Sequence, residues 1–154
     1  MRVRVFWIGK TRLPGVAELI DEYAKRLGRY CDFQGQELRE VLREGKRSAG
    51  GCTAAEEKLL SRSEGARRVA LDPAGRRWNS QELAKFLRTE RDGGGRAIAF
   101  CVGGAEGFSA AFREQADLLL SLSPMTLPHE LARVVLLEQL YRAFTLLAGH
   151  PYPR

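Results

Sequence analysis

The chain has 154 residues, of which 44% are hydrophobic and 29% charged, and a net charge of +6 gives a pI near 9.6. This composition predicts one globular domain, and its basic balance favours a polyanionic partner such as nucleic acid. No run of about 18 apolar residues occurs and the opening apolar run is too short for a signal peptide, so neither secretion nor membrane spanning is predicted.

The cysteines and histidines give no sign of a metal centre. Cys31, Cys52 and Cys101 are odd in number, widely spaced and outside any CxxC motif. This pattern indicates neither a disulfide framework nor a zinc knuckle, and it predicts a reduced, cytoplasmic protein. His129 and His150 are the only histidines, and no clustered spacing of ligands occurs, so no metal site is predicted.

The first half of the chain predicts a strand, a helix and a second strand. Residues 3–8 are a β-rich apolar run, and helical spacing of apolar residues follows over 14–29, with Pro14 suited to a first helical turn. Residues 33–41 are a weaker, more polar strand candidate. The loop 43–51 combines glycines with three basic residues and is a candidate RNA-facing patch.

Two capping boxes mark the next helices. Thr53 with Glu56 predicts a helix that runs to about Ser63, and Asn79 with Glu82 repeats the pattern at the start of another. In each box the side chain of the first residue bonds the amide of the second, and the acidic side chain reaches back.

Three further apolar segments, 66–71, 97–102 and 118–122, predict buried strands. A short amphipathic turn around Phe112 separates the last two, and a long helix over 128–148 follows them. Strands separated by helices are typical of a parallel sheet with helices on both faces. The predicted fold class is therefore α/β.

Ligands of open α/β sheets bind beyond the carboxyl ends of the strands, which directs attention to the loops after Leu71, Val102 and Leu122. The second loop, GGAEG, is not a GxGxxG motif, and no GxxxxGK[ST] occurs, so a dinucleotide fold and a P-loop are unsupported. The third, SPMTLPH, is more specific because a proline-stiffened segment presents Met125 and Leu127, a mixture suited to gripping an apolar ring. Packing in the core is the alternative for Met125.

Four segments carry a resemblance to a known family: LDPAG, AFCVGGAEG, LSLSPMTLPHELARVVLLEQLYRAF and the tail GHPY-R. They closely resemble the ribosomal RNA large-subunit methyltransferase H family of the SPOUT superfamily. The resemblance implies a single SPOUT methyltransferase domain over residues 1–154, with a deep C-terminal trefoil knot and a homodimeric assembly. It also implies S-adenosyl-L-methionine as cofactor and methylation of N3 of pseudouridine 1915 in 23S rRNA, within the assembled ribosome.

The resemblance also implies which residues hold the cofactor. Carried over by motif, they are Leu71, Gly103, Leu122, Ser123, Pro124, Met125, Thr126 and Leu127. Adenine would lie against the apolar side chains while backbone groups of the loop hydrogen-bond its edge, and Gly103 would leave room for the ribose or methionine part. Lys46 and Arg47 match a GKR-like stretch of the family and are candidate contacts for rRNA phosphates.

The final helix has apolar residues around more of its circumference than one sheet contact needs. We expect one side to pack on the sheet and the other on the same helix of a symmetry mate, as in an isologous dimer.

Methylation of a pyrimidine imide requires that the N3 proton be removed and the resulting anion be held. Arg154 is the natural cation for that anion or for a phosphate, and Tyr152 can stack on a base or hydrogen-bond it. Arg142 can support either role from the final helix. His129 is a candidate catalytic residue or, alternatively, a helix N-terminal residue packed beside Pro128.

Pro153 departs from the family, in which a histidine usually precedes the last basic residue. The general base therefore stays open among His150, His129, Glu106, Tyr152 and solvent. The departure also keeps a second hypothesis in view, namely a ribosome-binding homologue that retains the cofactor pocket but has lost efficient catalysis.

Overall fold

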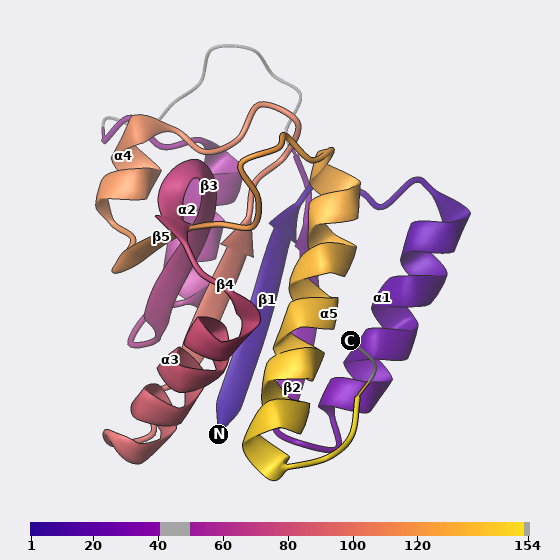
Figure 1. Ribbon diagram of the computed structural model, residues 1–154. Coiled ribbons are helices and arrows are strands. Elements are labelled where there is room, and N and C mark those ends of the chain that lie inside the picture. Colours follow the sequence, from indigo (N-terminus) through magenta and orange to yellow (C-terminus); the bar gives the residue numbers. More distant parts are fainter. Residues whose placement is uncertain (41–49, 153–154) are drawn as a thin grey trace.

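The computed structural model describes residues 1–40 and 50–152, and its centre is a parallel sheet in the order β2-β1-β4-β3-β5. The strands are β1 (Arg2–Ile8), β2 (Asp32–Leu38), β3 (Arg67–Arg77), β4 (Ile98–Val102) and β5 (Leu118–Ser121). One face carries α1 (Pro14–Leu27), α3 (Ser80–Asp92) and α5 (His129–Ala148), and the other carries α2 (Ala54–Arg62) and α4 (Ala110–Glu114) (Figure 1). The predicted α/β class is confirmed.

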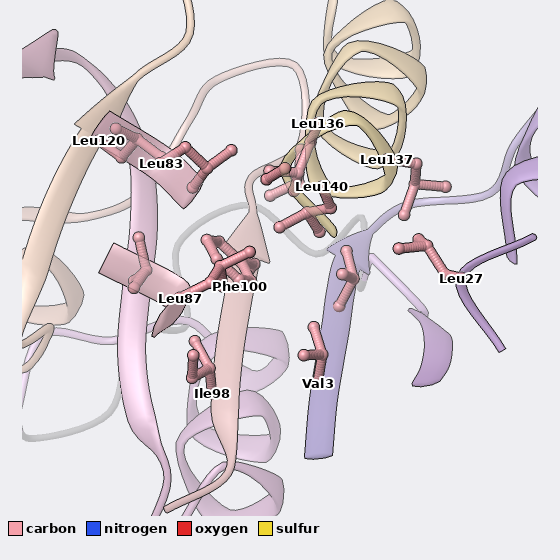
Figure 2. Close-up of a cluster of buried hydrophobic side chains, with 14 of the residues drawn as sticks. Val3, Leu27, Leu83, Leu87, Ile98, Phe100, Leu120, Leu136, Leu137 and Leu140 are labelled. Atoms are coloured by element: carbon pink, nitrogen blue, oxygen red, sulfur yellow. The ribbon is translucent and has the colours of Figure 1, made fainter. Parts of the chain in front are cut away.

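The two cores follow from the alternation of side chains along the strands. Val3 and Val5 point into the larger core, whereas Phe6 points into the smaller core under α2 and α4. Every residue of β4 is buried, which explains its uninterrupted apolar sequence. In Figure 2 the larger core joins Ile98 and Phe100 of the sheet to leucines of α3 and α5.

Both predicted capping boxes are present, at the first turns of α2 and α3. The hydroxyl of Thr53 accepts a hydrogen bond from the Glu56 amide (3.2 Å), and a Glu56 carboxylate oxygen accepts one from the Thr53 amide (2.9 Å). The carboxylate of Glu56 also accepts a hydrogen bond from the hydroxyl of Ser109, the N-cap of α4, at 2.6 Å. This hydrogen bond between Glu56 and Ser109 fixes α2 relative to α4.

The third strand differs from its prediction. The sequence predicts an end at Leu71, but β3 continues to Arg77 with a break in register, because Leu71 and Arg76 both pair with Leu120 of β5. Residues 72–75 lie outside the ladder between these two pairs. Alternation of apolar residues stops at Leu71, so the sequence pattern carried no signal for the second half of the strand.

A turn within residues 72–75 is held by Asp72, which is buried. One carboxylate oxygen of Asp72 accepts a hydrogen bond from the Ala74 amide (2.8 Å), and the other forms an ion pair with Arg113 of α4 (3.3 Å). The segment that the sequence marks as a candidate binding loop is therefore anchored to the smaller core.

The last helix lies between α1 and α3 across the middle of the sheet (Figure 1). Packing against α1 and α3 buries part of the apolar surface of α5 that was expected to contact a second copy of the chain. The larger apolar side chains that stay open on α5 are Leu131 and Leu146, which are 43% and 47% exposed. Gly149 ends the helix in the left-handed region (φ 67°), and the tail turns back between α5 and α1.

Some predictions fall outside the described residues. The second strand, predicted over 33–41, ends at Leu38. Lys46 and Arg47 of the basic loop lie outside the described residues, as do Pro153 and Arg154. Among the described helices, none combines the length and apolarity needed to cross a lipid bilayer.

Candidate functional site

Three of the expected binding segments meet at the carboxyl edge of the sheet. Ala70 pairs with Cys101 of β4, which places Leu71 beside the start of the glycine loop at Gly103. Leu71 also pairs with Leu120 of β5, two residues before Leu122. Parallel neighbouring strands thus bring Leu71, Gly103 and the 122–127 segment to one place.

The loop 122–128 is held by its own serines. The Ser121 hydroxyl donates a hydrogen bond to the Ser123 carbonyl oxygen, and the Ser123 hydroxyl accepts one from the Met125 amide, both at 2.9 Å. Met125 is 76% exposed, so the alternative that it packs in the core is wrong.

The remaining residues of this loop divide by exposure. Pro124 and Thr126 are exposed, whereas Leu122, Ser123 and Leu127 are half-buried. The loop therefore combines half-buried apolar side chains with exposed residues at 124–126.

The glycine loop after β4 is a tight turn. The Gly107 amide donates a hydrogen bond to the Gly104 carbonyl oxygen (3.0 Å), and Gly107 has a φ of 71°. A Cβ on Gly103 would lie 3.1 Å from the Cα of Gly107, so even one methyl group requires the backbone to move. The carboxylate of Glu40 stands over Gly104, with one oxygen 2.9 Å from where a Cβ on Gly104 would lie.

The second group of expected site residues lies far along α5. Arg142 forms an ion pair with Glu138 (2.6 Å), and its guanidinium lies over the ring of Tyr152, 4.6 Å from the centroid. The Tyr152 ring meets Tyr141 edge-on at 4.9 Å. Burial, together with a hydrogen bond to Tyr23, raises the pKa of Tyr152. Its phenol therefore stays protonated at neutral pH and is a poor base in this arrangement.

One chain does not bring the expected catalytic residues together. His129 is half-buried at the first turn of α5, and Arg142 follows 13 residues later. At 1.5 Å per residue this separates them by about 20 Å along the helix axis. His150, at the far end, is hydrogen-bonded through Nδ1 to the Tyr30 hydroxyl at 2.7 Å, and Arg154 lies outside the described residues.

Glu138 pairs with the candidate residue Arg142 and was not singled out by the sequence patterns, although a spacing of four residues on a helix is a recognisable pairing signal. Glu130 and Arg133 were also missed. Both are charged residues in an apolar helix, yet both are buried. No local pattern marks them, because their partners come from the opposite end of the chain.

A second hollow, of about 420 Å³, lies on the α2 side of β1 and β2 and is lined by Arg4, Phe6, Gln34, Gly35, Gln36 and Arg62. It contains none of the expected cofactor residues. The loops described above are the better candidate because polar backbone and apolar side chains converge there. Within residues 1–40 and 50–152, no group of three or more His, Cys, Asp or Glu side chains is placed to hold a metal ion.

Comparisons with known proteins agree with this architecture. Residues 1–153 match the family model described as "Predicted SPOUT methyltransferase". A relative from Thermus thermophilus, named ribosomal RNA large subunit methyltransferase H, is 46% identical over 154 residues, covering 100% of this chain and 99% of the relative.

Solved structures share the fold at low identity. A probable methyltransferase from Bordetella pertussis Tohama I superposes with a TM-score of 0.60 at 17% identity, covering 93% of this chain and 96% of the other. A putative methyltransferase from Legionella pneumophila, solved with bound S-adenosylmethionine, gives 0.54 at 15% identity, covering 91% and 65%. With the whole-length family match and a full-length relative at 46% identity, the chain belongs to the SPOUT methyltransferase family and groups with its ribosomal RNA large-subunit methyltransferase H members.

Proposed function

We propose that this protein is a cytoplasmic, S-adenosylmethionine-dependent methyltransferase that acts on N3 of pseudouridine 1915 in 23S rRNA of the assembled ribosome. The observation that carries the proposal is the convergence of Leu71, Gly103 and the 122–127 segment at the carboxyl edge of the sheet. The identity of the target nucleotide rests on the resemblance to the family, not on this convergence.

The residues present at that edge fit an adenosine ligand. Leu71, Leu122 and Leu127 are half-buried and offer apolar surface, and residues 124–126 of the serine-held loop are exposed beside them. Gly103 is buried, and a Cβ there would meet the backbone of Gly107, so glycine at this position allows the tight turn that shapes the loop after β4. When bound, S-adenosylmethionine supplies the methyl group on a sulfonium ion.

Exposed basic residues at the carboxyl edge of the sheet favour binding of ribosomal RNA there. Lys10 and Arg12 follow β1, Arg39 follows β2, and Arg76 and Arg77 end β3, all of them exposed. Because all the strands are parallel, these five cations lie at the edge that holds the proposed cofactor loops. They would contribute the salt-dependent, phosphate-directed part of RNA binding.

A homodimer would bring the two separated groups of residues together. On α5, Leu131, Val135, Glu138, Arg142 and Leu146 follow one another at helical spacing, and none of them is fully buried in the chain. We infer that a second copy covers this stripe and that Tyr152 and Arg142 of one protomer serve the cofactor loops of its partner. The separation of about 20 Å within one helix supports sharing because one chain cannot close it.

The knot expected from the resemblance stays a prediction. Its basis is the resemblance to the SPOUT superfamily, in which the chain is threaded near its C-terminus, although threaded chains are rare.

The residues of this chain would remove the N3 proton of the target nucleobase and stabilise the negative charge that results. Arg154 and Arg142 would hold a phosphate or the negative charge that develops on a pyrimidine carbonyl, and the protonated Tyr152 would stack on the base or donate to it. His129 and Glu106 lie near the cofactor loops of their own chain, and His150 lies at the tail end, so the base is still open among them and solvent.

The proposal is tested with purified protein, S-adenosylmethionine carrying a labelled methyl group, and ribosomes from a strain that lacks this gene. Mass spectrometry of the 23S rRNA should find one new methyl group on the pseudouridine, and calorimetry should detect cofactor binding. Cofactor binding without methyl transfer would instead support the ribosome-binding homologue, for which Pro153 is the specific observation. Absence of both would overturn the proposal.

A further inference from the structure

The first turn of α5, directly after the 122–128 loop, caps the start of α1. Glu130 Oε1 accepts hydrogen bonds from the backbone amides of Arg12 (2.6 Å) and Leu13 (3.1 Å). Leu13 is the N-cap residue of α1 and has no side-chain cap of its own, so Glu130 satisfies amides that the helix leaves unpaired. These amide hydrogen bonds, that of Leu13 above all, lower the pKa of Glu130, which is 8% exposed.

One helical turn later, Arg133 reaches the carboxyl end of β1. It donates from Nη2 to the Ile8 carbonyl oxygen (3.0 Å) and from Nη1 to the Thr11 hydroxyl (2.9 Å), and its guanidinium lies 6.0 Å from the Trp7 ring centroid. Arg133 is fully buried, and among the described residues its Nε has no hydrogen-bond partner. Within the described part of the chain no carboxylate forms an ion pair with it.

A buried cation without a paired carboxylate is costly. Burial is the largest influence on the pKa of Arg133 and lowers it, whereas the charges of Glu130, Glu37 and Glu40 act in the opposite direction. An apolar residue of similar size would fill this space at lower cost, so packing alone does not account for an arginine here. Its two hydrogen bonds instead fix the direction in which β1 leaves the sheet relative to α5.

The same segment is also tied to β2. The Glu37 carboxylate accepts hydrogen bonds from the Thr11 amide (3.0 Å) and from Trp7 Nε1 (3.4 Å). Glu130, Arg133, Thr11 and Glu37 therefore join α5 to β1, α1 and β2, and we call these four residues the α5 clamp.

We propose that Glu130 and Arg133 are positioning residues that hold the 122–128 loop in its ligand-binding shape. The loop is fixed at its start by β5, which pairs on both sides of the β3 register break, and at its end by the α5 clamp. Neither residue is expected to touch the cofactor. The ligand is S-adenosylmethionine, so the ligand-binding part of this inference rests on the proposed function.

Hydrogen exchange of the free protein tests the clamp without any ligand. Glu130→Ala should raise the exchange rate of the Met125 amide, which is hydrogen-bonded to the Ser123 hydroxyl, at least tenfold. Glu130→Gln keeps an oxygen that accepts both hydrogen bonds and should stay near the wild type. Leu27→Ala is the control, because Leu27 is fully buried in the same core at the far end of α1. If Leu27→Ala loosens the loop as much as Glu130→Ala, or if Glu130→Gln equals Glu130→Ala, the proposal is overturned.

Calorimetry with S-adenosylmethionine gives the second readout. The Kd should rise at least tenfold in Glu130→Ala and stay within about twofold of the wild type in Glu130→Gln and Leu27→Ala. A Kd unchanged in Glu130→Ala would overturn the positioning role even if the loop were looser. Failure of the wild type to bind this cofactor would count against the proposed function instead, while the exchange result would still decide the clamp.

Discussion

Gly75 crosses the backbone of Leu120 so closely that a Cβ on Gly75 would lie 2.6 Å from the Leu120 amide nitrogen. The contact is with backbone atoms of β5, which cannot move aside without breaking the β3–β5 ladder. Gly75 has no positive φ, so its requirement for glycine is steric. This close contact sets how near residues 72–75 lie to β5, the strand that leads into the 122–128 loop.

Gly75→Ala should therefore lower the free energy of unfolding by about 3 kcal/mol, measured by urea denaturation. Gly15→Ala is the matched control, because a Cβ there, on the first turn of α1, meets no atom of the described residues within 4 Å. That variant should be neutral or slightly stabilising. Equal stability of the two variants would show that β5 does not constrain Gly75.

Two adjacent glycines of the loop after β4 should respond differently to alanine. At Gly103 the added methyl group meets the backbone of Gly107, whereas at Gly104 it meets the end of the Glu40 side chain, which can rotate away. We expect Gly103→Ala to weaken S-adenosylmethionine binding at least tenfold and Gly104→Ala to weaken it less, as measured by calorimetry. The reverse order would argue that the cofactor does not approach Gly103.

A shared active site predicts complementation between two defective chains. Homodimers of Tyr152→Ala and of Gly103→Ala should both be poor methyltransferases. Random mixing makes half of the dimers heterodimers, and each has one intact site built from an intact tail and an intact cofactor loop. The mixture should regain about a quarter of the wild-type rate. A rate equal to the mean of the two parents would contradict sharing.

Stability should fall at alkaline pH because of Cys31. Burial raises the pKa of this thiol from 9.0 to about 11, so the folded state keeps its proton after the unfolded state has lost it. The stability present below pH 9 is therefore lost progressively as the pH rises towards 11. Urea denaturation from pH 8 to 11 should show a shallower fall for Cys31→Ala, and an identical fall would contradict this assignment.

Restoring the family's histidine gives a test of the missing base. Pro153→His should raise the methyl-transfer rate near neutral pH and add a dependence on a group with a pKa near 6.5. Pro153→Ala is the control, since it removes the ring constraint without adding an imidazole. If both variants change the rate equally, the effect belongs to the backbone and position 153 carries no proton.

Much of the fold could be predicted because its signals are local. Thr53 with Glu56 and Asn79 with Glu82 mark helix starts through contacts three residues apart, and both capping boxes are present. The apolar run 97–102 predicts a buried strand, and every residue of β4 (Ile98–Val102) is buried. The loops after Leu71, Val102 and Leu122 could be chosen as binding candidates because parallel strands place their carboxyl ends on one edge.

The features that could not be predicted depend on distant parts of the chain. The second half of β3 exists because Arg76 and Arg77 pair with β5, although their own sequence has no strand pattern. Core packing was the alternative to a cofactor contact for Met125, and only the path of the loop leaves this side chain exposed. Tyr152 packs on its own α5 because the turn at Gly149 sends the tail back along the helix.

The sequence by itself determined the α/β class, the family and the residue types available for cofactor and RNA binding, since these follow from short-range periodicity and motif. Only the tertiary structure decided which residues share a site. It placed His129 and Arg142 at separate levels of one rigid helix, and it buried Glu130 and Arg133 against partners 118 and 125 positions earlier in the chain. Such pairings are set by the packing of α5 on β1 and α1, and no local pattern encodes them.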